Sequence, residues 1–86
     1  MNISRPEQRV LHVLSQGGLI RYERSSGGKV TDVMCVTYDG SVLSDCTLPV
    51  FLKLRRKRLI RSVSGRPYRI SRLGRERVRA QADNRG

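Results

Sequence analysis

The fold is decided by the segment TLPVFLKLRRKRLIRSVSGRPYRI, residues 47–70. Thr47 is a preferred helix cap and Pro49 fits the first turn of a helix. The apolar residues that follow recur at spacings of three to five, so they predict a helix with one buried stripe. This stripe comprises Leu48, Phe51, Leu54 and, just past the helix, Leu59. Residues 60–63 and 67–70 predict two strands, joined by a turn at residues 64–66 that contains Gly65.

Most of the cationic charge lies in the same half of the chain. The 86 residues carry a net charge of +11. Residues 1–46 contain five Lys/Arg and five Asp/Glu, whereas residues 47–86 contain thirteen Lys/Arg and two Asp/Glu. This asymmetry predicts that the second half meets an acidic partner, with nucleic acid as the first candidate and an acidic protein surface as the second.

The candidate binding residues are the cations of this second half. Lys53, Arg56 and Lys57 are expected on the side of the helix opposite its apolar stripe. The cations of the following elements continue the run without interleaved acids. The full set is Lys53, Arg55, Arg56, Lys57, Arg58, Arg61, Arg66, Arg69, Arg72 and Arg75. The plainer alternative is a solvated helix face without a partner, and Arg66 is either a wing tip that reaches a minor groove or an ordinary polar turn residue.

The residues before this segment predict one helix and three strands. Ser4 and Glu7 have the spacing of a capping box, and Gly17-Gly18 ends a helix that has Val10, Leu11 and Leu14 on one face. Strands are expected at residues 19–24, 29–38 and 41–45, with a two-residue hairpin turn at Asp39-Gly40. The apolar run at residues 33–36 predicts cover on both faces of the middle strand.

The C-terminal part predicts a third helix at residues 72–81, capped by Ser71 and anchored by Leu73 and Val78. Residues 82–86 have nothing to bury and are expected to fray. The chain is long enough for only one small core, and it contains no linker, so we predict one domain, residues 1–81.

The pattern from residue 54 to residue 78 resembles the second half of many bacterial winged-helix regulators. Tyr68 and Ile70 are expected to point together into the core, and Gly74 is expected to let the last helix approach closely. We therefore expect an α+β, winged-helix-like domain with three helices, a β-meander between the first two and a wing hairpin before the third. The meander stands where a winged helix normally has another helix.

Few residues suggest catalysis. Cys35 and Cys46 are expected to be buried, reduced thiols, and the lone His12 is expected to have a structural or surface role. No paired carboxylates within a motif, phosphate loop or metal cluster is apparent, so we expect a binding protein without cofactor or metal. The enzymatic alternative is a small basic ribonuclease that acts through arginines and a tyrosine such as Tyr68.

Two further patterns concern location in the cell. No apolar run approaches the length of a membrane span. The start, MNISRPEQRV, lacks the apolar stretch of a signal peptide. We expect a cytoplasmic protein.

Several short segments spread along residues 2–85 resemble one protein family more closely. They include Leu11-His12-Val13-Leu14, Gly17-Gly18, Asp45-Cys46-Thr47-Leu48 and Pro67-Tyr68-Arg69-Ile70. In these segments the chain is similar to the YjhX family of small bacterial proteins. The resemblance implies a toxin that inhibits DNA topoisomerase I and is paired with an antitoxin encoded alongside it. In the family pattern an Arg-Glu pair often precedes the second hairpin glycine, whereas this chain has Tyr38-Asp39. A winged-helix DNA-binding protein, a transcriptional regulator or a nonspecific binder, is the alternative function.

Overall fold

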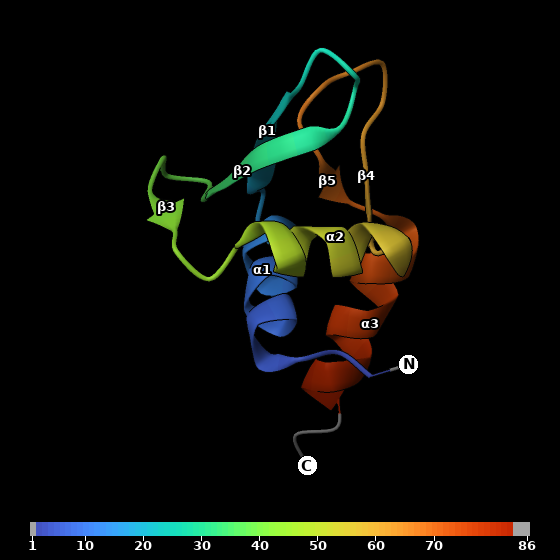
Figure 1. The fold of residues 1–86 in the computed structure, drawn as a ribbon. Coiled ribbons are helices and arrows are strands. Elements are labelled where there is room, and N and C mark those ends of the chain that lie inside the picture. Colours follow the sequence, from blue (N-terminus) through green and yellow to red (C-terminus); the bar gives the residue numbers. More distant parts are fainter. Residues whose placement is uncertain (1, 84–86) are drawn as a thin grey trace.

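The computed structural model describes residues 2–83, and the side chains of residues 2–79. Three helices and two small antiparallel sheets give an α+β fold, as expected (Figure 1). The elements are α1 Arg5–Ser15, β1 Leu19–Arg24, β2 Val30–Val36, β3 Val42–Leu43, α2 Leu48–Arg56, β4 Ile60–Arg61, β5 Arg69–Ile70 and α3 Arg72–Asp83. Helix α3 ends two residues later than predicted, and the rest of the expected tail lies outside the described residues. None of the described helices is long and apolar enough to cross a membrane.

The helices lie together in one layer, and the two β-hairpins project from the same side of it (Figure 1). The hairpins are joined at one point, because Ile20 N donates to Tyr68 O at 2.9 Å and Tyr68 N donates to Ile20 O at 2.8 Å. A second link runs from Tyr22 Oη to Gly65 O, at 3.0 Å. Strand β1 is thus held by β2 on one edge and by the β4–β5 hairpin on the other.

Side-chain caps fix the start of each helix. The predicted capping box of α1 is present, since Ser4 Oγ accepts from Glu7 N at 3.3 Å and Glu7 Oε1 accepts from Ser4 N at 3.1 Å. Thr47 Oγ1 accepts from Val50 N at 3.4 Å at the start of α2. Ser71 Oγ accepts from Gly74 N at 3.0 Å. Each cap satisfies a backbone donor that the helix itself leaves unpaired.

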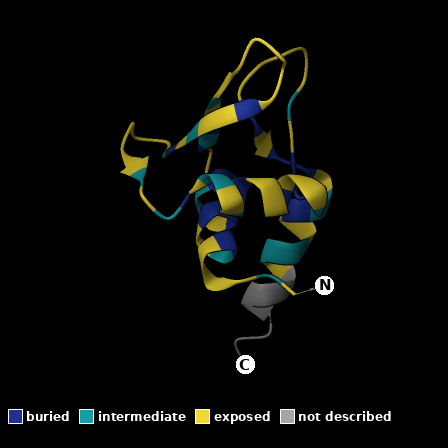
Figure 2. Cartoon of the chain, viewed as in Figure 1, coloured by how far each residue is buried: buried dark blue, intermediate teal, exposed yellow. Residues whose placement is uncertain are grey.

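The core lies where α1, α2 and the β layer meet (Figure 2). Phe51, Leu54 and Leu59 of the predicted stripe are completely buried, and its fourth member, Leu48, is partly buried against the core. The rings of Phe51 and Tyr68 pack edge to face with centroids 4.9 Å apart. Tyr68 and Ile70 both point into the core, as expected.

Gly74 is required by the close approach of α3 to the end of α2. A Cβ atom at this position would lie 2.3 Å from the carbonyl oxygen of Leu59. No side chain fits at that distance, so the predicted role of Gly74 is confirmed. This packing places the first turn of α3 beside the last residues of α2.

The β-meander differs from the prediction in three ways. Strand β2 is shorter at both ends, and β3 has only two residues, because the chain turns after Leu43 to reach the cap of α2. The hairpin turn closes between Thr37 and Ser41, so it is longer than the two-residue turn expected at Asp39-Gly40. Met34 is 48% exposed, so the expected cover on both faces of β2 was wrong.

The β4–β5 hairpin is also shorter than predicted. Only two residue pairs are in register, Ile60 with Ile70 and Arg61 with Arg69. The remaining residues, 62–68, form a loop in which Ser64 and Gly65 have left-handed backbones, with φ values of 55° and 73°. The strands end early because these two left-handed residues turn the chain and do not continue the pleat.

The two cysteines are buried, as predicted. They lie beside each other between β2 and the start of α2. A hydrogen bond from Cys46 lowers the pKa of the Cys35 thiol, although burial opposes this shift. The same bond, with burial, raises the pKa of Cys46. Cys35 is therefore the thiol of the pair that loses its proton more readily.

Candidate anionic-partner interface

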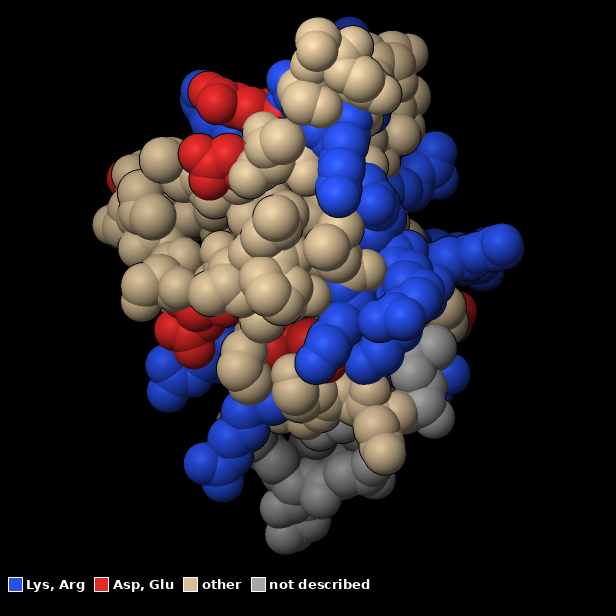
Figure 3. Space-filling model, in the orientation of Figure 1, with Lys and Arg blue, Asp and Glu red and all other residues tan. Residues whose placement is uncertain are grey.

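Arginines crowd the point where α2 ends, the β4–β5 hairpin begins and α3 starts. The backbones adjoin there, because Ser71 N donates to Leu59 O at 3.0 Å and Ser71 Oγ donates to Arg58 O at 2.7 Å. Figure 3 shows the cationic side chains gathered on this side of the molecule. We call the exposed arginines at this point the cationic junction; they are Arg58, Arg61, Arg69, Arg72 and Arg75.

Two of these arginines face each other across the hairpin. Arg61 and Arg69 are directly paired in the register of β4 and β5. Like charges directly opposite each other destabilise a strand pair. Neither arginine forms an ion pair with an acid among residues 2–79, whose side chains are described. Water and salt screen this repulsion in part, because both side chains are exposed.

The start of α3 adds to the positive potential. A helix N-terminus carries a partial positive charge and favours acidic residues in its first turn. The first turn of α3 contains no acid and instead contains Arg72 and Arg75. Glu76 lies 3.9 Å from Arg72, but both side chains are exposed, so this pair has little effect on stability. The junction therefore attracts anions through both its side chains and its helix end.

Arg58 occupies an unfavourable backbone conformation. Its φ is 62°, in the left-handed region. The bonds Leu59 N to Leu54 O and Arg58 N to Arg55 O, both 3.0 Å, form the helix-ending motif that usually places glycine at this position. A non-glycine residue there costs about 1–2 kcal/mol. The strained backbone makes Arg58 a candidate for a functional role.

The cations of α2 lie next to the junction. Lys53, Arg55 and Arg56 are exposed, and the Arg55 guanidinium lies 5.4 Å from the centre of the Phe51 ring. Cations in the last turn of a helix also stabilise its negative end. These three residues therefore have a structural role on α2 in addition to any contact with a partner.

Lys57 does not belong to the exposed cationic face, contrary to the prediction. Its Nζ lies 2.8 Å from Glu7 Oε2 and 3.1 Å from Glu7 Oε1, and it donates to Asn2 O. Glu7 is only 2% exposed. Burial raises the pKa of Glu7, but hydrogen bonds from Lys57 and Ser4 outweigh it and hold that pKa below its usual 4.5. Lys57 joins the end of α2 to the start of α1.

Arg66 stands apart from the junction, on the loop of the β4–β5 hairpin. Its backbone N donates to Val63 O at 3.1 Å and its carbonyl accepts from Ser62 Oγ. The bond from Tyr22 to Gly65 fixes this loop against β1. Arg66 is thus an exposed cation on a tethered loop.

The residues considered for catalysis are not grouped together. His12 is exposed on α1. Tyr68 is 8% exposed, with its ring between those of Tyr22 and Phe51. Within the part of the chain that the structure describes, no three His, Cys, Asp or Glu residues are placed to hold a metal ion.

Sequence reasoning missed two features of this region. The ion pair of Lys57 joins residues 50 positions apart, so no local pattern reveals it. The opposition of Arg61 and Arg69 follows from the hairpin register, which the prediction of longer strands left undetermined. The left-handed backbone of Arg58 had no glycine to mark it in the sequence.

Comparison with known proteins identifies the family. A family model described as "Putative toxin of bacterial toxin-antitoxin pair" matches residues 1–85. The chain belongs to the YjhX toxin family. Members of toxin-antitoxin pairs have a cognate antitoxin, so this YjhX protein has one partner defined by its family.

Its relatives include UPF0386 proteins of several bacteria. One from Beijerinckia indica is 66% identical over 85 residues, which cover 99% of this chain and 100% of the relative. One from Ruegeria sp. is 64% identical with the same coverage. One from Rhodospirillum rubrum is 60% identical over 86 residues, covering 100% of this chain and 96% of the relative. No solved structure matches this YjhX chain.

Proposed function

We propose that this toxin acts in the cytoplasm by binding and not by catalysis, that the cationic junction is its contact surface, and that its target is DNA topoisomerase I. The target comes from the family resemblance. The contact surface comes from the charges and geometry of the described residues. A topoisomerase working on DNA brings phosphates within reach, and an acidic patch on the enzyme would present the same charge.

The observation that carries the proposal is the unpaired opposition of Arg61 and Arg69. The hairpin is held in register against this repulsion by the burial of Ile60 and Ile70. An anion placed between the two guanidinium groups would turn the repulsion into attraction, because each would then share an opposite charge. Arg58 in its strained backbone lies at the neighbouring turn.

A relaxation assay at rising DNA concentration, with the enzyme fixed, tests the target. A toxin that binds the enzyme keeps its inhibition as DNA is added. A protein that only coats DNA is titrated away in proportion to the added DNA. Loss of inhibition in that proportion would reject the topoisomerase target. Salt sensitivity alone does not decide, because both kinds of contact weaken with salt.

Direct binding to duplex DNA is the second candidate. It is favoured by the order of a helix, a tethered hairpin and a third helix, which is that of a winged-helix domain. In this proposal α2 and the loop that carries Arg66 contact the duplex. Replacing Lys53, Arg56 and Arg66 with glutamine should then reduce the slope of log affinity against log salt by nearly three, since each phosphate contact contributes about 0.9. An unchanged slope would reject the candidate.

A further inference from the structure

The outer face of the β-meander is an open surface that the cationic junction does not use. The register of β1, β2 and β3 places every second residue on this face. Three cross-strand rows follow along the strands. They are an apolar row of Leu19, Val36 and Val42, a mixed row of Arg21 and Met34, and an acidic row of Glu23 and Asp32.

Several apolar side chains on and beside this face are unusually exposed for such a small protein. Val42 is 60% exposed and Met34 is 48% exposed. Tyr38, on the turn that follows β2, is 82% exposed and lies against Gly17. Large apolar side chains gathered on one face of a small domain mark a site of protein contact.

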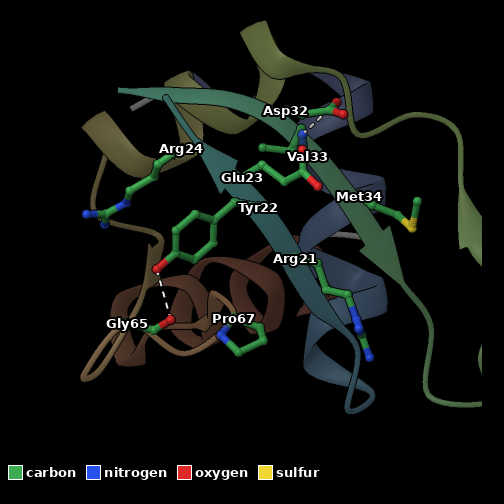
Figure 4. Close-up of a pocket in the computed structure, with 9 residues that line it drawn as sticks. All are labelled: Arg21, Tyr22, Glu23, Arg24, Asp32, Val33, Met34, Gly65 and Pro67. Carbon is green, nitrogen blue, oxygen red and sulfur yellow. Dashed lines mark hydrogen bonds between the residues drawn. The ribbon is translucent and has the colours of Figure 1, made fainter. Parts of the chain in front are cut away.

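The acidic row is electrostatically unsatisfied. Glu23 and Asp32 are directly opposite each other, and like charges in that arrangement repel. Neither forms an ion pair among the described residues, although the chain has 18 Lys/Arg. Figure 4 shows that Arg21 and Arg24 both extend away from this row, and the Arg24 guanidinium lies 5.2 Å from the centre of the Tyr22 ring.

A groove connects this face with the β4–β5 loop. It has a volume of about 770 Å³, and its border includes both acidic side chains, Arg21 and Arg24 as well as Met34, Gly65 and Pro67. The Tyr22 ring forms part of its wall, and its bond to Gly65 keeps the two sides in place (Figure 4). The bond from Tyr22 to Gly65 therefore holds the two walls of the groove together, with the acids at one end.

Asp32 also has a local role that restricts how a partner approaches. Its Oδ1 accepts from Val33 N at 3.1 Å, so the carboxylate covers a backbone donor beside the open edge of β2. A charged side chain in that place discourages another strand from adding to the edge. A partner is thus expected to cover the face and not to extend the sheet.

We propose that this face docks the cognate antitoxin, through a segment that presents apolar side chains and, further along, a Lys or Arg. Charge complementarity selects this occupant: nucleic acid is repelled by the acidic row, and a cation is attracted to it. Successive rows lie about 7 Å apart along a strand, so the cation and the apolar contacts are separated by about 13 Å. The proposal rests on the toxin-antitoxin pairing of the family and not on the identity of the toxin's target.

The test uses the full-length toxin and the purified antitoxin encoded beside it, with affinity measured by calorimetry at two salt concentrations. Glu23→Gln with Asp32→Asn removes the acidic row, and Met34→Ser with Val42→Ser removes the apolar contacts. Val63→Ser, at a residue 52% exposed on the other hairpin, is the matched control. Each double variant should weaken binding at least tenfold, the first should also lose salt dependence, and the control should stay within twofold.

The melting temperature separates docking from folding. The Glu23→Gln, Asp32→Asn variant removes a repulsion, so it should melt at the same or a higher temperature while it binds less well. If the Met34→Ser, Val42→Ser variant unfolds, the charge variant alone decides. Unchanged affinity in the charge variant, or no complex with the wild-type toxin, would overturn the proposal.

Two other readouts complete the test. Sedimentation of the toxin alone should show a monomer, and a dimer that dissociates in the Met34→Ser, Val42→Ser variant would instead assign this face to a second copy. In cells, the charge variant should still arrest growth but escape neutralisation by the antitoxin. Failure of the wild-type toxin to inhibit topoisomerase I would reject the proposed function and leave the binding result unaffected.

Discussion

The β-meander and the junction of α2, β4–β5 and α3 are built alike but carry opposite charges. Both contain a short antiparallel hairpin with like charges opposite each other, Glu23 with Asp32 in one and Arg61 with Arg69 in the other. Neither pair has an ion-pair partner among the side chains of residues 2–79. The two pairs differ in sign, and this difference is the basis of both proposals, an anionic partner at the junction and a cationic protein segment at the meander.

Both surfaces depend on one core, so the largest effect is expected there. Phe51→Ala should lower the free energy of unfolding by about 3–5 kcal/mol, because the ring is completely buried between α2 and Tyr68. Urea denaturation measures this loss. Leu52→Ala is the matched control on the same helix, and it should change stability by about 0.5 kcal/mol or less, since Leu52 is partly exposed. Equal losses in the two variants would contradict the described core.

A comparison of Lys57 with Lys53 tests which cations of α2 stabilise the fold and which are free to bind a partner. Lys57→Met should lower stability by about 2 kcal/mol, because it leaves the buried carboxylate of Glu7 without its main partner. Lys53→Met, at an exposed position on the same helix, should leave stability nearly unchanged. Thermal unfolding of the two variants checks this. A Lys57→Met protein as stable as the wild type would place Lys57 back among the binding cations.

The same ion pair predicts a pH dependence. The folded-state pKa of Glu7 lies below its ordinary 4.5, so its contribution to stability is complete above that pH and is lost as the pH falls through the lower folded value. The difference in stability between the wild type and Glu7→Gln should therefore shrink as the pH is lowered below about 4.5. A difference that stays constant down to pH 3 would show that the Glu7 carboxylate is not what Lys57 stabilises.

How much of the fold and of the candidate site could be predicted from the sequence depends on how far apart in the chain the interacting residues are. The three helix starts and all of β1 were predicted, because caps and periodicity act between near neighbours. The length of β3 was not, because the chain turns directly after Leu43 to reach the cap at Thr47. The candidate cations were right in type, but only the fold separates Lys57, which is paired across 50 residues, from its exposed neighbours.

Arg58 should give a smaller effect of opposite sign. Arg58→Gly relieves the left-handed strain but adds freedom to the unfolded chain, so stability should rise by about 0.5–1 kcal/mol. The same variant should inhibit less well, since it removes one guanidinium from the junction. Urea denaturation and a relaxation assay on one preparation measure both. A gain in stability without loss of inhibition would mean that Arg58 has no part in the contact.

The most direct test of the central claim is the inhibitory concentration of a junction variant in the topoisomerase I relaxation assay. Arg61→Gln with Arg69→Gln removes the opposed pair, and Arg5→Gln with Lys29→Gln removes two exposed cations from the neutral half as a matched control. The account predicts that the junction variant needs at least tenfold more protein for half inhibition, a loss of about 1.4 kcal/mol. It predicts a control within twofold of the wild type and melting temperatures that do not fall. Equal losses in both variants, or none in the junction variant, would contradict the claim that the toxin acts through this junction.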